Sequence, residues 1–101
     1  MIIVGDYDNC REVTVDGKIL DPKPSQKVWN HSPDGFNWGY GGSGPAQLAL
    51  AILLAAGIRR EDAVTVHQAF KWTFIAPLPR EESFSITVDI PAWFKTEIER
   101  Q

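Results

Sequence analysis

The chain has 101 residues, the size of one small domain, and its 44% hydrophobic and 23% charged residues are ordinary for a folded protein. We therefore expect a single domain over residues 1–101. The net charge of −3 argues against direct nucleic-acid binding, which depends on an excess of lysine and arginine. The single cysteine, Cys10, excludes an internal disulfide and fits a reducing compartment.

The amino-terminal segment MIIVGDYDNC lacks a basic region, and its apolar run is only three residues long, so we do not expect a signal peptide. The longest apolar run, residues 48–56, has nine residues, whereas a membrane span needs about 20. We expect a cytoplasmic protein that does not enter a membrane.

The first twenty residues predict a small antiparallel β-meander. Residues 2–4 and 13–15 are β-branched runs, Asp16-Gly17 suits a tight hairpin turn, and residues 18–20 can form the returning strand. Residues 21–43 then carry three prolines and four glycines and show neither helical nor alternating periodicity. We expect a long, ordered Pro/Gly-rich loop here, packed down by its aromatic residues.

Residues 44–56 predict the central helix. Pro45 suits the first helical position, Gln47 can reach back to cap the helix entry, and Gly57 is a good stop. Every residue from 48 to 56 is apolar, and a helix that is apolar all round is buried.

A second helix is predicted from Arg60, with apolar residues at spacings of three and four, and Pro77 ends it. Because aromatic and polar residues alternate over residues 70–75, a strand there is an alternative. Residues 84–88 can form a short strand, and Asp89 is a suitable N-cap for a last helix. The fold class is α+β, with the central buried helix flanked by two further helices.

Four motifs are spread over most of the chain. They are V-D-G-x-x-L at residues 15–20, S-P-x-G-F-x-W-G-Y-G-G-S-G-P-A-Q-L-A at 32–49, F-K-x-x-x-I-A-x-L-P at 70–79 and I-x-x-W at 90–93. Through these motifs the chain resembles a family of small uncharacterised proteins of bacteria, archaea, phages and other mobile elements. The resemblance implies no activity. It implies a genomic context in which small accessory and anti-defence proteins are common.

The glycine-rich segment before the central helix has two interpretations. Free amides at a helix start bind anions, so Gly42, Ser43 and Gly44 are candidate contacts for a nucleotide or another small anion. Alternatively, the glycines only permit a sharp entry into the helix. No lysine follows at the position of a phosphate-binding loop, and the spacing of a nucleophile elbow is absent.

Two histidines are the candidate reactive groups. His31 stands beside Ser32 and near Asp34, which suggests a small hydrolase, although these residue types also cap turns in Pro-rich loops. His67 lies on the apolar stripe of the second helix, and we interpret it as a core residue.

A metal site is not expected. Asp6 and Asp8 alternate with Tyr7 and would share one face of a strand, either as cation ligands or as an acidic edge that opposes aggregation. No spacing among the acidic residues, Cys10 and the histidines matches a known metal site, and we predict neither a metal nor another cofactor.

The loop aromatics Trp29, Trp38 and Tyr40 either anchor the loop on the core or form a contact surface. We expect a non-catalytic binding protein with a host protein as its partner. The alternatives are a small-molecule anion binder and a hydrolase using His31. Four tryptophans also allow an aromatic homodimer interface. The candidate ligand- or partner-binding residues are His31, Ser32, Trp38, Tyr40, Gly42, Ser43 and Gly44.

Overall fold

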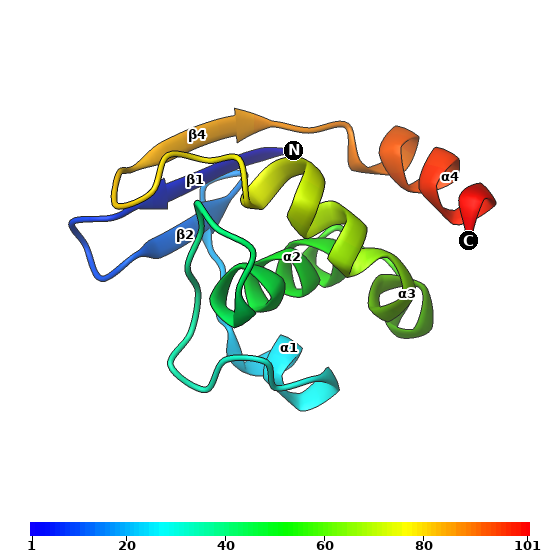
Figure 1. The fold of residues 1–101 in the computed structure, drawn as a ribbon, viewed down its shortest axis with the longest axis horizontal. Coiled ribbons are helices and arrows are strands. Elements are labelled where there is room, and N and C mark those ends of the chain that lie inside the picture. The colour runs from blue at the N-terminus through cyan, green and yellow to red at the C-terminus, as the bar shows by residue number, and fades with distance from the viewer.

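A four-stranded antiparallel sheet lies over a group of helices in the computed structural model, which describes residues 1–101 (Figure 1). The strand order is β3-β2-β1-β4, and both neighbours of β1 run antiparallel to it. The α+β class and the amino-terminal meander are therefore confirmed. The strands are β1 (Ile2–Asp6), β2 (Glu12–Val15), β3 (Lys18–Ile19) and β4 (Phe84–Thr87).

The hairpin between β2 and β3 turns where the sequence predicted it. Asp16 and Gly17 have φ angles of 49° and 82°, the left-handed conformation that a tight hairpin turn requires. The Asp16 carboxylate also accepts a hydrogen bond from the Ile2 amide at 2.7 Å. This bond ties the turn to the first residue of β1.

The expectation that Asp6 and Asp8 share a strand face is wrong. Asp6 is the last residue of β1, and Asp8 lies in the turn that follows. The Asn9 amide donates to the Asp6 carbonyl at 3.3 Å, and Cys10 and Arg11 have φ angles of 55° and 56°. This tight reversal ends the alternation of faces before Asp8.

Helix α2 is the centre of the helical layer, as its apolar sequence predicted. Its residues from Gly44 to Leu53 are all buried, and it packs against α1, α3 and η1. Helix α4 packs on α3, with Trp93 against Phe70 at a centroid distance of 5.1 Å. The helices are α1 (Lys23–Val28), α2 (Ser43–Ala55), α3 (Arg60–Phe70), the π-helix η1 (Lys71–Ile75) and α4 (Ile90–Arg100).

Two local predictions fail. Helix α1 lies inside the segment expected to be a loop, because six residues are too few to show a helical period. The strand alternative for residues 70–75 is also wrong. There α3 continues as a π-helix, in which the Ala76 amide donates to the Lys71 carbonyl at 2.8 Å. A π-turn inserts one extra residue and is frequent at functional sites.

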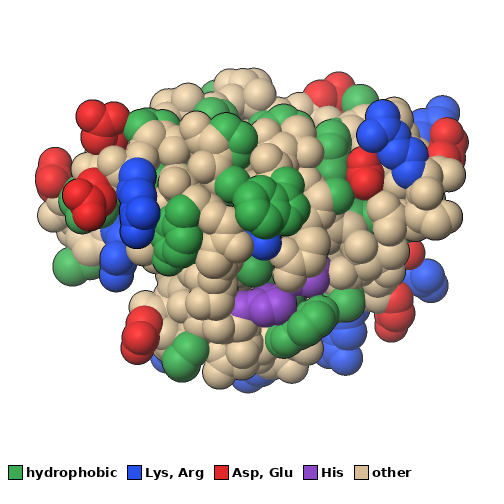
Figure 2. All heavy atoms as spheres, viewed as in Figure 1, with side chains coloured by type: hydrophobic (Ala, Val, Ile, Leu, Met, Phe, Trp, Pro, Cys, Tyr) green, Lys and Arg blue, Asp and Glu red, His purple; other side chains and the backbone are tan.

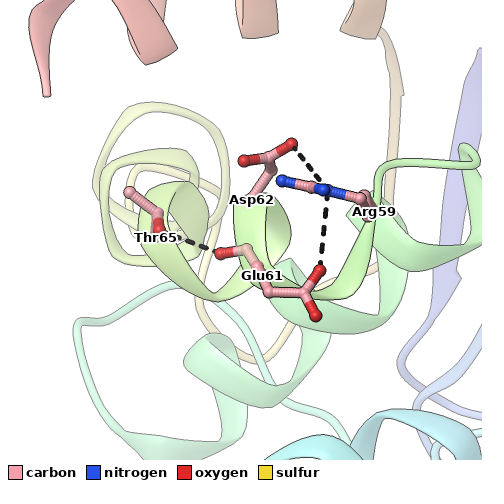
Figure 3. A network of polar contacts seen from close by, with 4 residues as sticks. All are labelled: Arg59, Glu61, Asp62 and Thr65. Carbon is pink, nitrogen blue, oxygen red and sulfur yellow. Dashed lines mark hydrogen bonds and ion pairs between the residues drawn. The ribbon is translucent and has the colours of Figure 1, made fainter.

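The first turn of α4 is capped by a side chain, and the first turn of α3 carries acidic residues instead. Asp89 caps α4 by accepting from the Ala92 amide at 3.1 Å, as predicted. At the start of α3, the Arg59 Nε lies 3.5 Å from a carboxylate oxygen of Glu61 and of Asp62 (Figure 3). These acidic groups complement the positive helix end, but such exposed pairs add little stability.

None of the helices combines the length and the hydrophobicity that a membrane span requires.

Candidate binding surface

The loop after α1 and helix α3 bring the two histidines together. The Nε2 atoms of His31 and His67 lie 2.9 Å apart, a hydrogen-bond distance. In Figure 2 the purple histidine side chains lie next to each other on the visible face. His67 is 1% exposed, as its core assignment predicted, whereas His31 is half-buried. No sequence pattern links two residues 36 positions apart, so this pairing was not foreseen.

The hydrogen bonds of His67 fix the proton positions in the neutral pair. His67 Nδ1 lies 2.7 Å from the Val64 carbonyl oxygen, which can only accept, so Nδ1 carries the hydrogen. The Nε2 atom of neutral His67 is then an acceptor, and His31 donates to it from its own Nε2. This tautomer leaves His31 Nδ1 as an acceptor that makes no hydrogen bond within the chain.

Lys71 adds a positive charge beside the histidine pair, and no carboxylate neutralises it. Burial lowers the pKa of His67, the Val64 carbonyl partly opposes this, and the Lys71 charge lowers it further. Burial lowers the pKa of His31 as well, and His67 and Lys71 add to the effect. Burial also lowers the pKa of Lys71. The ion pairs of the protein are formed by Arg59 and Arg100, so no carboxylate pairs with Lys71.

Gln47 holds the His31 loop in place. Its side chain is completely buried, and its Oε1 accepts from the amides of His31 at 2.7 Å and Ser32 at 3.0 Å. Its Nε2 donates to Ser25 Oγ at 2.8 Å and to the Trp29 carbonyl at 3.1 Å. The prediction that Gln47 caps its own helix is therefore wrong. Its side chain instead ties the α1 region to α2.

One exposed tryptophan contacts the histidines, and a second contacts Lys71. Trp29 is 48% exposed and stacks on His31 at a centroid distance of 4.3 Å. Trp72 is 60% exposed, and Lys71 Nζ lies 4.3 Å from its ring centroid. In Figure 2, hydrophobic side chains lie on both sides of the histidines. A basic side chain is visible between the histidines and the hydrophobic side chain above them. We call this region the tryptophan–histidine surface: Trp29, His31, His67, Lys71 and Trp72.

The loop glycine Gly41 supports this surface. Its carbonyl accepts from Lys71 Nζ at 3.1 Å. A Cβ atom at this position would overlap the Trp72 ring, so the ring rests directly on the glycine backbone. Part of the glycine-rich motif thus serves the packing of a surface tryptophan, which the sequence alone did not indicate.

Trp38, a predicted contact residue, belongs to the core. Its side chain is completely buried, its Nε1–H donates to the Glu82 carbonyl at 2.8 Å, and its ring packs edge-on against Phe84. It therefore presents no surface to a ligand in this structure, and we remove it from the candidate contacts. Trp72, which the sequence reasoning did not select, is exposed.

The other predicted contacts gather in a separate cleft of about 280 Å³ at the start of α2. Gly42 is the N-cap of α2, with the Tyr40 ring against it. Arg11 and Asp34 bring one charge of each sign to the cleft lining. The predicted residues that line this cleft are Ser32, Tyr40, Ser43 and Gly44.

His31 alone among the predicted contacts lies on the tryptophan–histidine surface. Neither Ser32 nor Ser43 donates its hydroxyl to His31, whose ring partner is His67. The structure has no group of three or more His, Cys, Asp or Glu side chains that could hold a metal ion. The residues that sequence reasoning missed are Lys71 and Trp72. One sequence feature could have placed Lys71 near the site: it follows His67 by four positions, which is one helical turn.

The fold and this surface define a small α+β domain with two exposed tryptophans beside a histidine pair and a lysine. The chain belongs to a family of unknown function, DUF6166, whose sequence profile matches residues 4–96. The search of curated proteins found no match, and neither did the search of solved structures.

The histidine pair is expected to make folding stability depend on pH. In the unfolded chain His31 and His67 titrate at the ordinary histidine pKa of 6.5. In the folded chain their pKa values are lower. Between these values the unfolded state holds more protons, so the free energy of unfolding falls as pH falls below 6.5 and levels off under the lowered pKa. Thermal melts between about pH 5 and 7.5, the range in which histidine titrates, measure this slope.

The matched variant for this test is the double substitution His31→Gln/His67→Gln, which removes both titrating rings. Its melting temperature should change less over the same pH range than that of the wild type. An equal slope in both proteins would show that other groups cause the pH dependence.

Proposed function

We propose that this chain is a non-catalytic binding protein of phages or mobile elements that works in the cytoplasm of a bacterial or archaeal host. Its partner is a host protein, and its role is to antagonise host defence in the manner of an anti-CRISPR protein. The observation that carries the binding role is the exposure of Trp29 and Trp72 on either side of the histidine pair.

Large aromatic side chains at such positions favour a protein-contact role. Tryptophan is among the residues most enriched in the energetic centres of protein interfaces. Trp29 is stacked on His31, and Trp72 is held between Lys71 and the Gly41 backbone. Because both rings are ordered by their neighbours, binding through them would cost little conformational entropy. The net charge and the absence of an arginine-rich face favour a protein over nucleic acid.

Affinity purification from host cells tests the binding role. The double variant Trp29→Ala/Trp72→Ala is expected to retain at least about tenfold less of the partner than the wild type, the loss typical of two interface hot spots. Ile19→Ser is the matched control, because Ile19 is a 70% exposed apolar residue on strand β3. Equal recovery with the double variant would remove these tryptophans from the interface.

The antagonist role is tested in cells that carry active CRISPR–Cas immunity. Expression of the wild-type chain should raise the plating efficiency of a targeted phage, and the double tryptophan variant should not. Unchanged immunity across a panel of CRISPR–Cas types would contradict this role while leaving the binding role intact.

A second candidate function is binding of a small anion, such as a nucleotide, in the cleft at the start of α2. The observation that favours it is that Arg11, Ser32 and Ser43 line this cleft together. Titration calorimetry with a nucleotide panel should then give heat that disappears in Arg11→Ala. The hydrolase alternative has less support, because His31 lacks a serine partner.

A further inference from the structure

Lys71 is buried without a charged partner. Its residue is only 6% exposed, and lysines are rarely buried unless an acidic group pairs with them. The Lys71 ammonium has three N–H donors, of which one reaches the Gly41 carbonyl, while the Trp72 ring lies beside the charge. Donor capacity therefore remains for a ligand.

His31 adds a second group with unused capacity. Its Nδ1 makes no hydrogen bond within the chain, and it becomes a donor when the ring takes up a proton. His31 Nε2 lies 2.9 Å from His67 Nε2, and His67 precedes Lys71 by four positions, one helical turn, so the positive charge of Lys71 acts on both histidines. No acidic side chain pairs with any of these three groups. The local charge is therefore suited to an anion.

We propose that Lys71 and His31 bind a carboxylate of the protein partner, from an aspartate or glutamate side chain or from the carboxyl terminus. This inference rests on the proposed function. Carboxylate binding is therefore coupled to proton uptake by His31: the protonated ring and Lys71 give two donor groups that match the two oxygens of a carboxylate, whereas a phosphate would retain oxygens without donors. The Trp29 ring stacks on His31 and the Trp72 ring lies beside Lys71, so a partner that covers both rings would shield these charge-assisted hydrogen bonds from water.

Acetate is the simplest probe of this carboxylate site. In an NMR titration at constant ionic strength, sodium acetate should shift the His31 ring, Gly41 amide and Trp72 indole signals saturably. Half-saturation is expected on the order of 10 mM, the affinity that two charge-assisted hydrogen bonds provide. Sodium chloride in place of acetate should give no saturable shift.

Substitutions assign the binding to Lys71. Lys71→Met keeps an apolar stem of similar length and should weaken acetate binding at least tenfold, and Lys71→Arg should retain most of it. Lys95→Met is the matched control on the exposed face of α4 and should bind acetate like the wild type. Equal acetate binding by Lys71→Met, or no saturable shift in the wild type, would overturn the proposal. Phosphate binding ten times tighter than acetate would overturn the assignment to a carboxylate.

Thermal melts separate a binding role from a structural one. Lys71→Met removes a buried, unpaired charge, so its melting temperature should equal or exceed that of the wild type. A marked decrease would show that Lys71 is retained for stability. If acetate fails to bind while the double tryptophan variant still loses the partner, only this inference fails. If acetate binds but no partner is recovered, only the proposed function fails.

Discussion

Replacing Gln47 by alanine is expected to lower the free energy of unfolding by about 3 to 4 kcal/mol, the largest polar effect that we predict for this protein. The side chain makes four hydrogen bonds from a completely buried position. Its removal leaves the Ser32 amide without an acceptor and the His31 amide with only the Trp29 carbonyl at 3.1 Å, and the Ser25 hydroxyl and the Trp29 carbonyl lose a donor. Each unsatisfied buried group costs about 1 to 3 kcal/mol. Denaturant unfolding measures the loss.

The loss should be local as well as global. Hydrogen exchange of the His31 and Ser32 amides should accelerate in Gln47→Ala, and Trp29 should lose its stacking on His31. Gln68→Ala is the matched control, because it replaces an exposed helical glutamine and should change stability by less than about 0.5 kcal/mol. If Gln47→Ala were as stable as the control, the buried network would not be what orders this loop.

Trp38→Ala is expected to cost about 3 to 5 kcal/mol, as truncation of a buried large aromatic residue does. The ring packs edge-on against Phe84 and lies close to Gly5, where a Cβ atom would come within 2.9 Å of it. The Glu82 carbonyl also loses the indole N–H as a donor. We expect an incompletely folded or strongly destabilised chain, measured by thermal and denaturant unfolding.

Trp72→Ala is the contrasting substitution. Its ring is 60% exposed, so stability should change by less than about 1 kcal/mol, and the effect should be on binding. Trp38 thus belongs to the core, and Trp72 belongs to the proposed contact surface. A small loss in Trp38→Ala, or a loss of similar size in both variants, would contradict this division.

Local features of the fold were predictable because they depend on neighbouring residues. Asp16-Gly17 adopts the left-handed angles of its turn, and Asp89 caps the last helix, as their sequence positions indicate. The nine-residue apolar run of α2 could only be buried in a small domain. Helix α1 was missed because its six residues are too few to show a helical period, and its hydrogen bonds to Gln47 join residues distant in sequence.

The candidate site was only partly predictable. His31 was selected for its chemistry, but its partner His67 comes from another element, and the contact depends on how α3 packs beside the loop. Trp38 was selected as a contact and Trp72 was not, whereas the structure buries Trp38 and exposes Trp72. Trp38 lies under the sheet, while the π-turn of η1 leaves Trp72 on the surface beside Lys71.

The sequence by itself determined the α+β class, the meander, the buried helix and membership in the family, because these follow from periodicity, turn chemistry and motif. Only the tertiary structure decided which groups meet. In the folded chain His31 contacts His67, and Lys71 bonds to a backbone carbonyl with no acidic partner. Gln47 of α2 bonds to Ser25 of α1. Such contacts between distant segments depend on the packing of whole elements, which no local pattern records.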